Sequence, residues 1–322
     1  MTQKDLFHIA ENWFQKQDWK PFPFQKESWN AFLEGKHGLL NAPTGSGKTY
    51  ALWFPIVLNY IKNNPDYKTK HKKGLKAIWI TPLRALSQEI KQSAERITQD
   101  LETQMTVGIR TGDTSAKERA KMRTNMPDLL ITTPESLQLL LSSKDYKKTF
   151  KNCSAIVVDE WHELLGTKRG VQMELGLSRL KTICKELRIW GISATIGNLE
   201  QAREVLLGPT SPELENSVLV KANLNKKITV KSIVPKEMET FPWRGHLGLH
   251  LLDQVVPIIN NSKTTLLFTN TRSQCEIWFQ KISRICRGNG HAPRQHQQRN
   301  PTVGGAGHPK RKSKSSGLHI EP

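Results

Sequence analysis

A glycine-rich loop between a short apolar run and a longer apolar segment is the feature that most constrains this chain. Residues 42–49 read Ala-Pro-Thr-Gly-Ser-Gly-Lys-Thr, after the apolar run 38–40 and before residues 50–61, which can form a helix. Small residues let backbone N–H groups close around phosphate oxygens, while lysine reaches the β and γ phosphates and threonine can ligate Mg²⁺. The pattern predicts a phosphate loop with these candidate residues: Ala42, Thr44, Gly45, Ser46, Gly47, Lys48 and Thr49.

An acidic strand end further along the chain provides the second half of such a site. The β-branched apolar run 155–158 leads directly into Asp159, Glu160, Trp161 and His162. A buried parallel strand of this kind presents one carboxylate to a metal ion and a second to an attacking water. The alternative is a glycine-rich turn and an unrelated strand end, but both halves have the expected flanking segments. Together they predict a site for ATP and Mg²⁺, with the metal near Thr49 and Asp159.

Strand-length apolar runs alternate with longer amphipathic segments from residue 38 to about residue 220. One expected helix, 87–101, shows an apolar stripe at helical spacing. This alternation predicts an α/β fold in which helices flank a parallel sheet. The expected strands are 38–40, 75–80, 105–109, 128–132, 155–158 and 188–192.

The pattern changes near residue 221, where proline and glycine become frequent. We therefore expect a first lobe at 1–220, a connection at 221–248 and the start of a second α/β lobe at 249–286. After residue 286 the chain is polar and basic with few apolar residues, so we expect a disordered tail at 287–322.

The net charge and the positions of the cysteines exclude some classes of function. The chain has 48 basic and 29 acidic residues, a formal charge of +19, which favours nucleic acid as a partner over a free-standing small-molecule kinase. Its four cysteines are too far apart to suggest a zinc site or a disulfide framework. The start is not a signal segment, and no apolar run is long enough to span a bilayer. We expect a soluble cytoplasmic protein without a membrane partner.

Short polar clusters follow several of the predicted strands. In an open α/β sheet the carboxyl ends of strands are where ligands bind, and hydroxyls and backbone N–H groups there suit sugar–phosphate oxygens. Any one cluster alone is equally well explained as an ordinary helix cap. The clusters are Thr81-Pro82-Leu83-Arg84-Ala85-Leu86, Arg110-Thr111-Gly112-Asp113, Thr132-Thr133-Pro134-Glu135-Ser136-Leu137 and Ser193-Ala194-Thr195.

In this order and spacing, the phosphate loop, the Asp-Glu-Trp-His strand end and these clusters resemble superfamily 2 helicases of the DExH type. Residues 159–166, 191–198 and 241–248 are similar to the Lhr-like group, particularly to bacterial ligase-associated DEXH-box DNA helicases. The resemblance covers roughly residues 8–280. It implies a RecA-like fold, ATP hydrolysis, DNA with a single-stranded region or 3′ overhang as partner, 3′→5′ movement, and DNA repair beside a ligase and a nuclease.

The resemblance also implies a role for each matching residue. Gln25 would read the adenine edge; the alternative is a solvated residue opening a helix, but its distance before the phosphate loop favours the adenine role. Asp159 would hold the metal through water, and Glu160 would orient and deprotonate the hydrolytic water. His162 would act with Ser193 and Thr195 to couple nucleotide state to the grip on nucleic acid. The residues implied to touch the tracking strand are Thr81, Arg84, Thr111, Gly112, Thr133 and Pro134.

The chain departs from the family pattern near its end. Residues 269–272 look like the first motif of a second lobe, but we find no later motif and no arginine finger. A truncated or frameshifted product is one interpretation, and a natural nucleic-acid-binding extension is the other. We expect weak ATP·Mg²⁺ binding and reduced hydrolysis. A non-catalytic nucleic-acid clamp and an RNA-directed DExH enzyme remain alternative functions.

Overall fold

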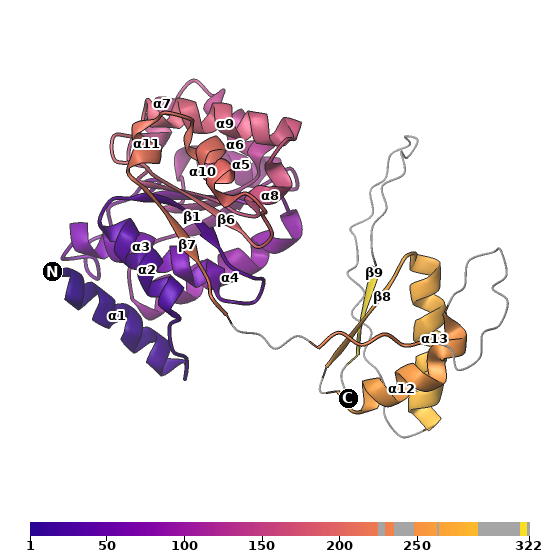
Figure 1. The fold of residues 1–322 in the computed structure, drawn as a ribbon. Coiled ribbons are helices and arrows are strands. Elements are labelled where there is room, and N and C mark those ends of the chain that lie inside the picture. The colour runs from indigo at the N-terminus through magenta and orange to yellow at the C-terminus, as the bar shows by residue number, and fades with distance from the viewer. Residues whose placement is uncertain (225–228, 235–247, 263, 289–315, 321–322) are drawn as a thin grey trace. The chain divides into compact units, whose positions relative to one another are not determined.

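The protein divides into two compact units, Met1–Asn225 and Lys226–Pro322 (Figure 1). The computed structural model describes residues 1–224, 229–234, 248–262, 264–288 and 316–320. Most of the expected connection at 221–248, including segment 241–247 of the resemblance, and most of the expected tail at 287–322 lie outside these residues. The two units are described separately below.

The first unit contains a seven-stranded sheet whose neighbours all pair in parallel. The α/β fold class expected from the alternating pattern is confirmed, and all six expected strands are present. A seventh strand at the sheet edge was not expected, because its apolar run is only three residues long, 218–220, and no polar motif follows it. In sheet order, the strands are β3 (Val107–Arg110), β4 (Leu129–Thr132), β2 (Ala77–Ile80), β5 (Ala155–Val158), β6 (Arg188–Ser193), β1 (His37–Asn41) and β7 (Ser217–Lys221).

Helices cover both faces of this sheet, which explains why its central strands are apolar along their whole length. In β2, Ala77 and Trp79 join one core, while Ile78 and Ile80 join the other, as the two-residue period of a strand requires. One core packs under α1 (Gln3–Lys16), α2 (Pro23–Leu33), α3 (Lys48–Asn63) and α4 (Ser87–Asp100). The other packs under α6 (Pro134–Leu141), α7 (Tyr146–Phe150), α8 (Trp161–Leu164), α9 (Lys168–Lys181) and α10 (Leu199–Leu207).

Aromatic side chains fix the N-terminal helices to the sheet. Trp13 of α1 lies 5.0 Å from Phe54 of α3 between ring centroids, and Trp29 of α2 lies 5.5 Å from Phe54. The Trp13 indole Nε1 also donates to Asp100 Oδ2 at the end of α4, at 2.8 Å. Helices α1 and α2 are therefore part of the main core rather than an appendage.

The strand order determines which segments meet at the carboxyl edge of the sheet. Strands β5, β6 and β1 are consecutive neighbours, so the segments that follow Val158, Ser193 and Asn41 lie beside one another. The next neighbour, β2, ends at Ile80 opposite Val158. Connecting elements are η1 (Arg84–Leu86), α5 (Ala116–Thr124) and α11 (Pro212–Glu215).

The second unit is small in its described part. It contains η2 (Leu249–Leu251), α12 (Leu252–Asn260), β8 (Thr265–Thr269), α13 (Arg272–Gly288) and β9 (Ser316–Ile320). Ile259, Trp278 and Ile282 form its buried centre. Strand β9 pairs antiparallel with β8 and lies inside the segment expected to be a disordered tail. That expectation does not hold for these five residues, because backbone pairing at a sheet edge requires little apolar sequence. No helix in the described parts of the chain is long and apolar enough to cross a membrane.

Gly170, near the start of α9, provides a test of how closely α9 packs against α8, the helix that follows β5. A Cβ on Gly170 would lie 2.1 Å from the backbone oxygen of Leu164, the last residue of α8. We expect Gly170→Ala to lower the free energy of unfolding by about 1–3 kcal/mol, because backbone must shift to accept the methyl group. Chemical denaturation measures the change. The control is Gly197→Ala, whose Cβ would meet nothing within 4 Å; equal losses in both variants would contradict this packing.

Candidate functional site

The phosphate loop joins the end of β1 to the first residue of α3. Gly45 and Gly47 have φ of +75° and +83°, in the left-handed region that favours glycine. The Ser46 hydroxyl donates to the Pro43 carbonyl at 2.7 Å, which closes the loop on itself. The loop ends at the N-terminus of α3, a helix of 16 residues. Free backbone N–H groups and the helix dipole favour an anion at this position.

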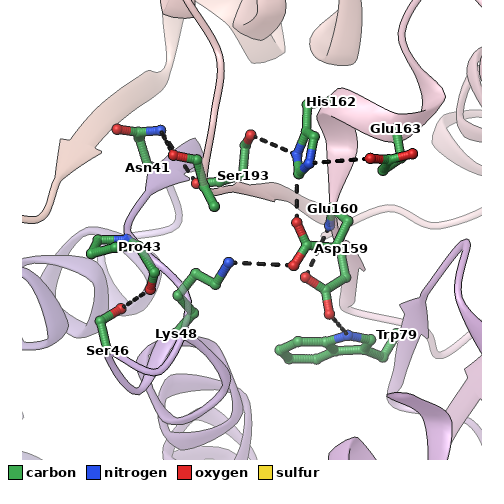
Figure 2. A network of polar contacts seen from close by, with 11 residues as sticks. Asn41, Pro43, Ser46, Lys48, Trp79, Asp159, Glu160, His162, Glu163 and Ser193 are labelled. Carbon is green, nitrogen blue, oxygen red and sulfur yellow. Dashed lines mark hydrogen bonds and ion pairs between the residues drawn. The ribbon is translucent and has the colours of Figure 1, made fainter. Parts of the chain in front are cut away.

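The loop lysine meets the acidic strand end (Figure 2). Lys48 Nζ lies 3.4 Å from Glu160 Oε1, and the two side chains are only 10% and 15% exposed. Glu160 adopts a φ of +46° at the start of α8, a conformation that is uncommon for a residue with a side chain. Packing thus holds its carboxylate toward the loop at some cost in backbone energy. The structure brings together the two halves expected from sequence.

Asp159 lies deeper than Glu160 and is held by two donors. The Trp79 indole Nε1 donates to Asp159 Oδ2 at 3.2 Å, and the Glu160 backbone N–H donates to Oδ1 at 2.9 Å. Burial, and next the neighbouring Glu160 carboxylate, raise the pKa of Asp159 from 3.8 to about 6. A buried pair of carboxylates with one lysine therefore leaves this site short of positive charge.

A third strand end completes the network. His162 Nδ1 lies 3.0 Å from the Ser193 hydroxyl and 3.4 Å from Glu160 Oε2, and the His162 Nε2 lies 3.6 Å from Glu163 Oε1. Asn41, the last residue of β1, donates through its amide to the Ser193 carbonyl at 3.3 Å. The ends of β1, β5 and β6 are thus joined by side-chain contacts (Figure 2).

Gln25 lies at the phosphate loop, with its amide satisfied at both ends. Its Oε1 accepts from the Phe22 backbone N–H at 2.8 Å, and its Nε2 donates to the Gly47 carbonyl at 3.0 Å. It is 2% exposed, so the interpretation as a solvated residue is wrong. The contact ties α2 to the loop, and recognition of adenine by Gln25 stays a prediction.

The remaining loop residues differ in exposure. Ala42 and Ser46 are buried, whereas Thr44 and Gly45 are exposed. The Thr49 hydroxyl has no hydrogen-bond partner among the described residues, and Thr195 is exposed beyond the end of β6. In the described part of the chain no three acidic, histidine or cysteine side chains form a ready metal cluster. Mg²⁺ fits this donor set, since it binds one or two carboxylates and keeps phosphate oxygens and waters as its other ligands.

The residues expected to touch nucleic acid divide into two groups. The hydroxyls of Thr81, Thr111 and Thr133 make local hydrogen bonds that fix the turns after β2, β3 and β4, and all three residues are buried. Pro134 is also buried. Arg84 and Gly112 are exposed and adjacent, because a Cβ on Gly112 would lie 2.7 Å from Arg84 Nη2. Arg84 also pairs with Asp113 at 2.8 Å.

Sequence reasoning missed several residues that hold the site together. Arg169 bonds the Pro82 carbonyl at 3.1 Å and Glu135 Oε1 at 2.6 Å, so it joins the turns after β2 and β4. Arg119 donates to the Gly112 carbonyl at 2.7 Å. Trp79 and Asn41 support Asp159 and Ser193. Trp79 lies within an apolar strand and Asn41 ends one, so a side chain able to form hydrogen bonds in such a strand could have indicated both residues. Arg169 and Arg119 lie in helices that carry no motif, so nothing in the sequence indicated them.

The raised pKa of Asp159 makes a prediction about stability. The folded protein holds this proton more tightly than the unfolded chain, so the contribution of Asp159 to stability is highest below about pH 4 and is lost as pH rises to about 6. We expect the stability of Asp159→Asn relative to the natural protein to increase by about 2–3 kcal/mol between pH 4 and pH 7, measured by urea denaturation without nucleotide. The exposed change Asp145→Asn is the control; a pH-independent difference for Asp159→Asn would contradict the expectation.

Comparisons with known proteins agree with this geometry. Residues 22–202 match the DEAD/DEAH box helicase family. The chain is 32% identical over 291 residues to ATP-dependent helicase Lhr-Core of Methanocaldococcus jannaschii, covering 85% of this chain and 33% of that protein. It is 31% identical to the Lhr helicase/uracil glycosylase of Escherichia coli, covering 87% of this chain and 20% of that protein.

Solved structures give the same picture. Mycobacterium smegmatis helicase Lhr, solved with ssDNA and AMP-PNP, superposes with a TM-score of 0.69 at 27% identity, covering 88% of this chain and 36% of that one. The DUF1998 helicase MrfA, at 22% identity and a TM-score of 0.69, supports the fold alone.

The expected resemblance to the Lhr-like group is confirmed by these relatives. The chain spans about a third or less of the length of the curated Lhr proteins it matches. The match at 22–202 covers more than half of the chain and contains both the phosphate loop and the Asp-Glu-Trp-His strand end. This chain belongs to the DEAD/DEAH box helicase family.

Proposed function

We propose that this chain is part of an Lhr-type, ATP-dependent nucleic-acid helicase, and that its first unit binds and hydrolyses ATP. The observation that carries the proposal is the approach of Lys48 to Glu160, with buried Asp159 beside them, at the adjoining ends of β1 and β5. A buried site with two carboxylates and one lysine lacks compensating positive charge, which suits a ligand that arrives with a metal ion.

The lysine contact sets the first step of the mechanism. Lys48 Nζ lies 3.4 Å from Glu160 Oε1. The terminal phosphates of ATP offer Lys48 a stronger anionic partner, which frees the Glu160 carboxylate to accept a proton from the attacking water. The left-handed backbone of Glu160 and its contact with His162 keep this carboxylate aimed at the loop.

The metal ligands follow from the same geometry. Thr49 at the start of α3 and Asp159 at the end of β5 would hold Mg²⁺, which neutralises charge on the phosphates when bound. The two donors to Asp159, Trp79 and the Glu160 backbone, favour its ionised form, which is the form that a cation needs. Gln25 would read adenine from its place beside Gly47.

The Ser193 network provides a route from nucleotide to nucleic acid. His162 contacts both Glu160 and Ser193, so departure of the cleaved terminal phosphate would change the partners available to Glu160 and, through His162, to the end of β6. We assign coupling to His162, Ser193 and the exposed Thr195 that follows. Arg84 and Gly112 are exposed for contact with a strand backbone, whereas the buried residues Thr81, Thr111, Thr133 and Pro134 shape the turns that present backbone groups.

We assign DNA with a single-stranded region as the partner, supported by the basic charge of +19 and by the similar mycobacterial Lhr, which was solved with ssDNA. Contacts to a strand backbone make binding salt-dependent and largely independent of base sequence. A role in cytoplasmic DNA repair with a ligase and a nuclease, and 3′→5′ movement, rest on the resemblance of the motifs.

We propose that these 322 residues, taken alone, turn over slowly. Among the described residues, the ion-pair and hydrogen-bond partners of Lys48, Asp159 and Glu160 include no arginine. An arginine finger supplies on the order of 10³–10⁵ in rate, or about 4–7 kcal/mol. We assign residues 1–220 to the first RecA-like lobe, 221–248 to the interlobe connection, 249–286 to the start of a second lobe, and 287–322 to a basic tail.

The ATPase activity of the purified chain tests this function. We expect slow hydrolysis that single-stranded DNA stimulates, and a loss of at least about 100-fold in Glu160→Gln, because the variant cannot accept a proton from water. Lys48→Ala is expected to weaken nucleotide binding as well, because the phosphates lose a charged donor.

A salt titration of DNA binding with and without AMP-PNP provides the second readout. A motor lobe changes its DNA affinity with nucleotide, and Glu160→Gln retains that change. The proposed function would be contradicted if AMP-PNP did not change the affinity for DNA and if Glu160→Gln still hydrolysed ATP. That result would favour a passive nucleic-acid clamp. Tighter binding to the RNA strand of the same sequence would indicate an RNA-directed enzyme.

A variant of Trp79 tests whether its indole N–H positions the Asp159 carboxylate or whether the ring only packs in the core. Trp79→Phe removes the donor to Asp159 but keeps a ring against Trp53, whose centroid is 4.6 Å away. Because that donor lowers the pKa of Asp159, its removal raises the pKa further. We expect AMP-PNP·Mg²⁺ affinity to fall about three- to tenfold at pH 6 and less at pH 8, measured by calorimetry.

The matched control is Trp53→Phe. The Trp53 indole Nε1 is buried without a hydrogen-bond partner among the described residues, so this change loses ring area but no polar contact. We expect a pH-independent effect in the control. The same pH dependence in both variants would show that Trp79 acts through packing alone.

A further inference from the structure

A basic pocket lies at the amino edge of the first unit's sheet, away from the strand ends that form the nucleotide site. Lys76 and Ser154 line it immediately before β2 and β5, and Asn59 and Asn63 line it from the last turns of α3. Because all strands are parallel, the amino ends of β2 and β5 lie at the edge opposite Asp159. The pocket has a volume of about 560 Å³, within the range of small-ligand sites.

Positive charge dominates this pocket. Its lining contains one carboxylate, Glu186, and five lysines. None of the five lysines has a carboxylate within ion-pair distance among the described residues, whereas nearby Lys68 and Lys70 are paired with Glu102 and Asp66. Five unpaired ammonium groups around one hollow favour an anion. The lysines are Lys72, Lys73, Lys76, Lys151 and Lys185.

Buried polar groups in the lining provide a second, independent indication of a ligand. Asn59 is 6% exposed, lines the pocket and has no hydrogen-bond partner for its amide among the described residues. The Asn64 Oδ1 is also buried without a partner, although its Nδ2 donates to the Tyr60 carbonyl at 2.8 Å. A buried carbonyl oxygen without a partner, such as Asn64 Oδ1, is costly, so its presence in the pocket lining beside the Asn59 amide points to a group that completes these hydrogen bonds.

We infer that this pocket is a second phosphate-binding site, separate from the phosphate loop, for a ligand of nucleotide size that carries one or more phosphate groups. The lysines bind the phosphates, and the asparagine amides bind a polar group attached to them. Both a free phosphorylated molecule and the backbone of a nucleic-acid strand present this chemistry. The other role open to the lysines is to neutralise free carbonyls at the C-terminal ends of α3 and α7.

Calorimetry on the full chain separates these possibilities. All samples carry Lys48→Ala, which weakens the phosphate loop, and are titrated with inorganic tripolyphosphate and with a short oligothymidylate. We expect Lys76→Ala/Lys151→Ala to lower affinity by about tenfold or more, since each lysine provides a charge-assisted contact. Asn59→Ala is expected to weaken oligothymidylate more than tripolyphosphate, because only the former carries a polar group beyond phosphate.

The control Lys68→Ala/Lys148→Ala removes the same charge from exposed positions outside the pocket lining. We expect it to change affinity by less than about twofold at about 0.15 M salt. If the Lys48→Ala parent binds tripolyphosphate, the ligand is a free phosphorylated molecule; if it binds only the oligonucleotide, the ligand is a strand backbone. Either result supports the site when the pocket variant abolishes that binding.

Three results would overturn the inference: equal losses in pocket and control variants, no loss in the pocket variant, or binding of polyglutamate but of neither phosphate probe. If lysines only neutralise helix ends, the pocket variant loses thermal stability without losing phosphate affinity. Lys151 is exposed, so Lys151→Ala alone keeps the test valid should the double variant fail to fold, with an expected loss of about threefold.

Discussion

The approach of Lys48 to the buried carboxylates of Asp159 and Glu160 is the interaction on which the proposed chemistry depends. Burial makes the ionised Asp159 carboxylate costly, and one lysine offsets only part of that cost. The Trp79 indole and the Glu160 backbone N–H donate to Asp159, and Glu160 itself adopts a left-handed backbone conformation. In the proposed function, the phosphates and a cation would supply the negative and positive partners that this group of side chains lacks.

The parallel sheet gives this unit two edges with different chemistry. Its carboxyl edge gathers the loop, the acids and His162, and hydrogen bonds through Ser193 and Asn41 join three neighbouring strands into one network. Its amino edge gathers unpaired lysines around a hollow. Strands β2 and β5 run from one edge to the other, so their paired and buried residues separate the proposed nucleotide site from the lysine pocket.

Local sequence was sufficient to predict most of the sheet. Strands β1, β2, β4, β5 and β6 each contain an uninterrupted run without polar side chains, and such runs are typical of strands buried on both faces. The edge strand β7 escaped prediction because its apolar run, 218–220, is short and no polar motif follows it. Pairing of β9 with β8 was also missed, since a polar segment gives no sign of a backbone partner distant in sequence.

The sequence by itself determined which chemical groups are available for the proposed site: a glycine-rich loop with Lys48 and Thr49, a strand that ends in two acids, and polar clusters after strands in a recognisable order. Only the tertiary structure decided the proximity of these groups, because strand order places β5, β6 and β1 side by side although they are distant in sequence. The same is true of Trp79 against Asp159 and of the lysine pocket. Their partners come from non-local packing, which leaves no motif in the chain.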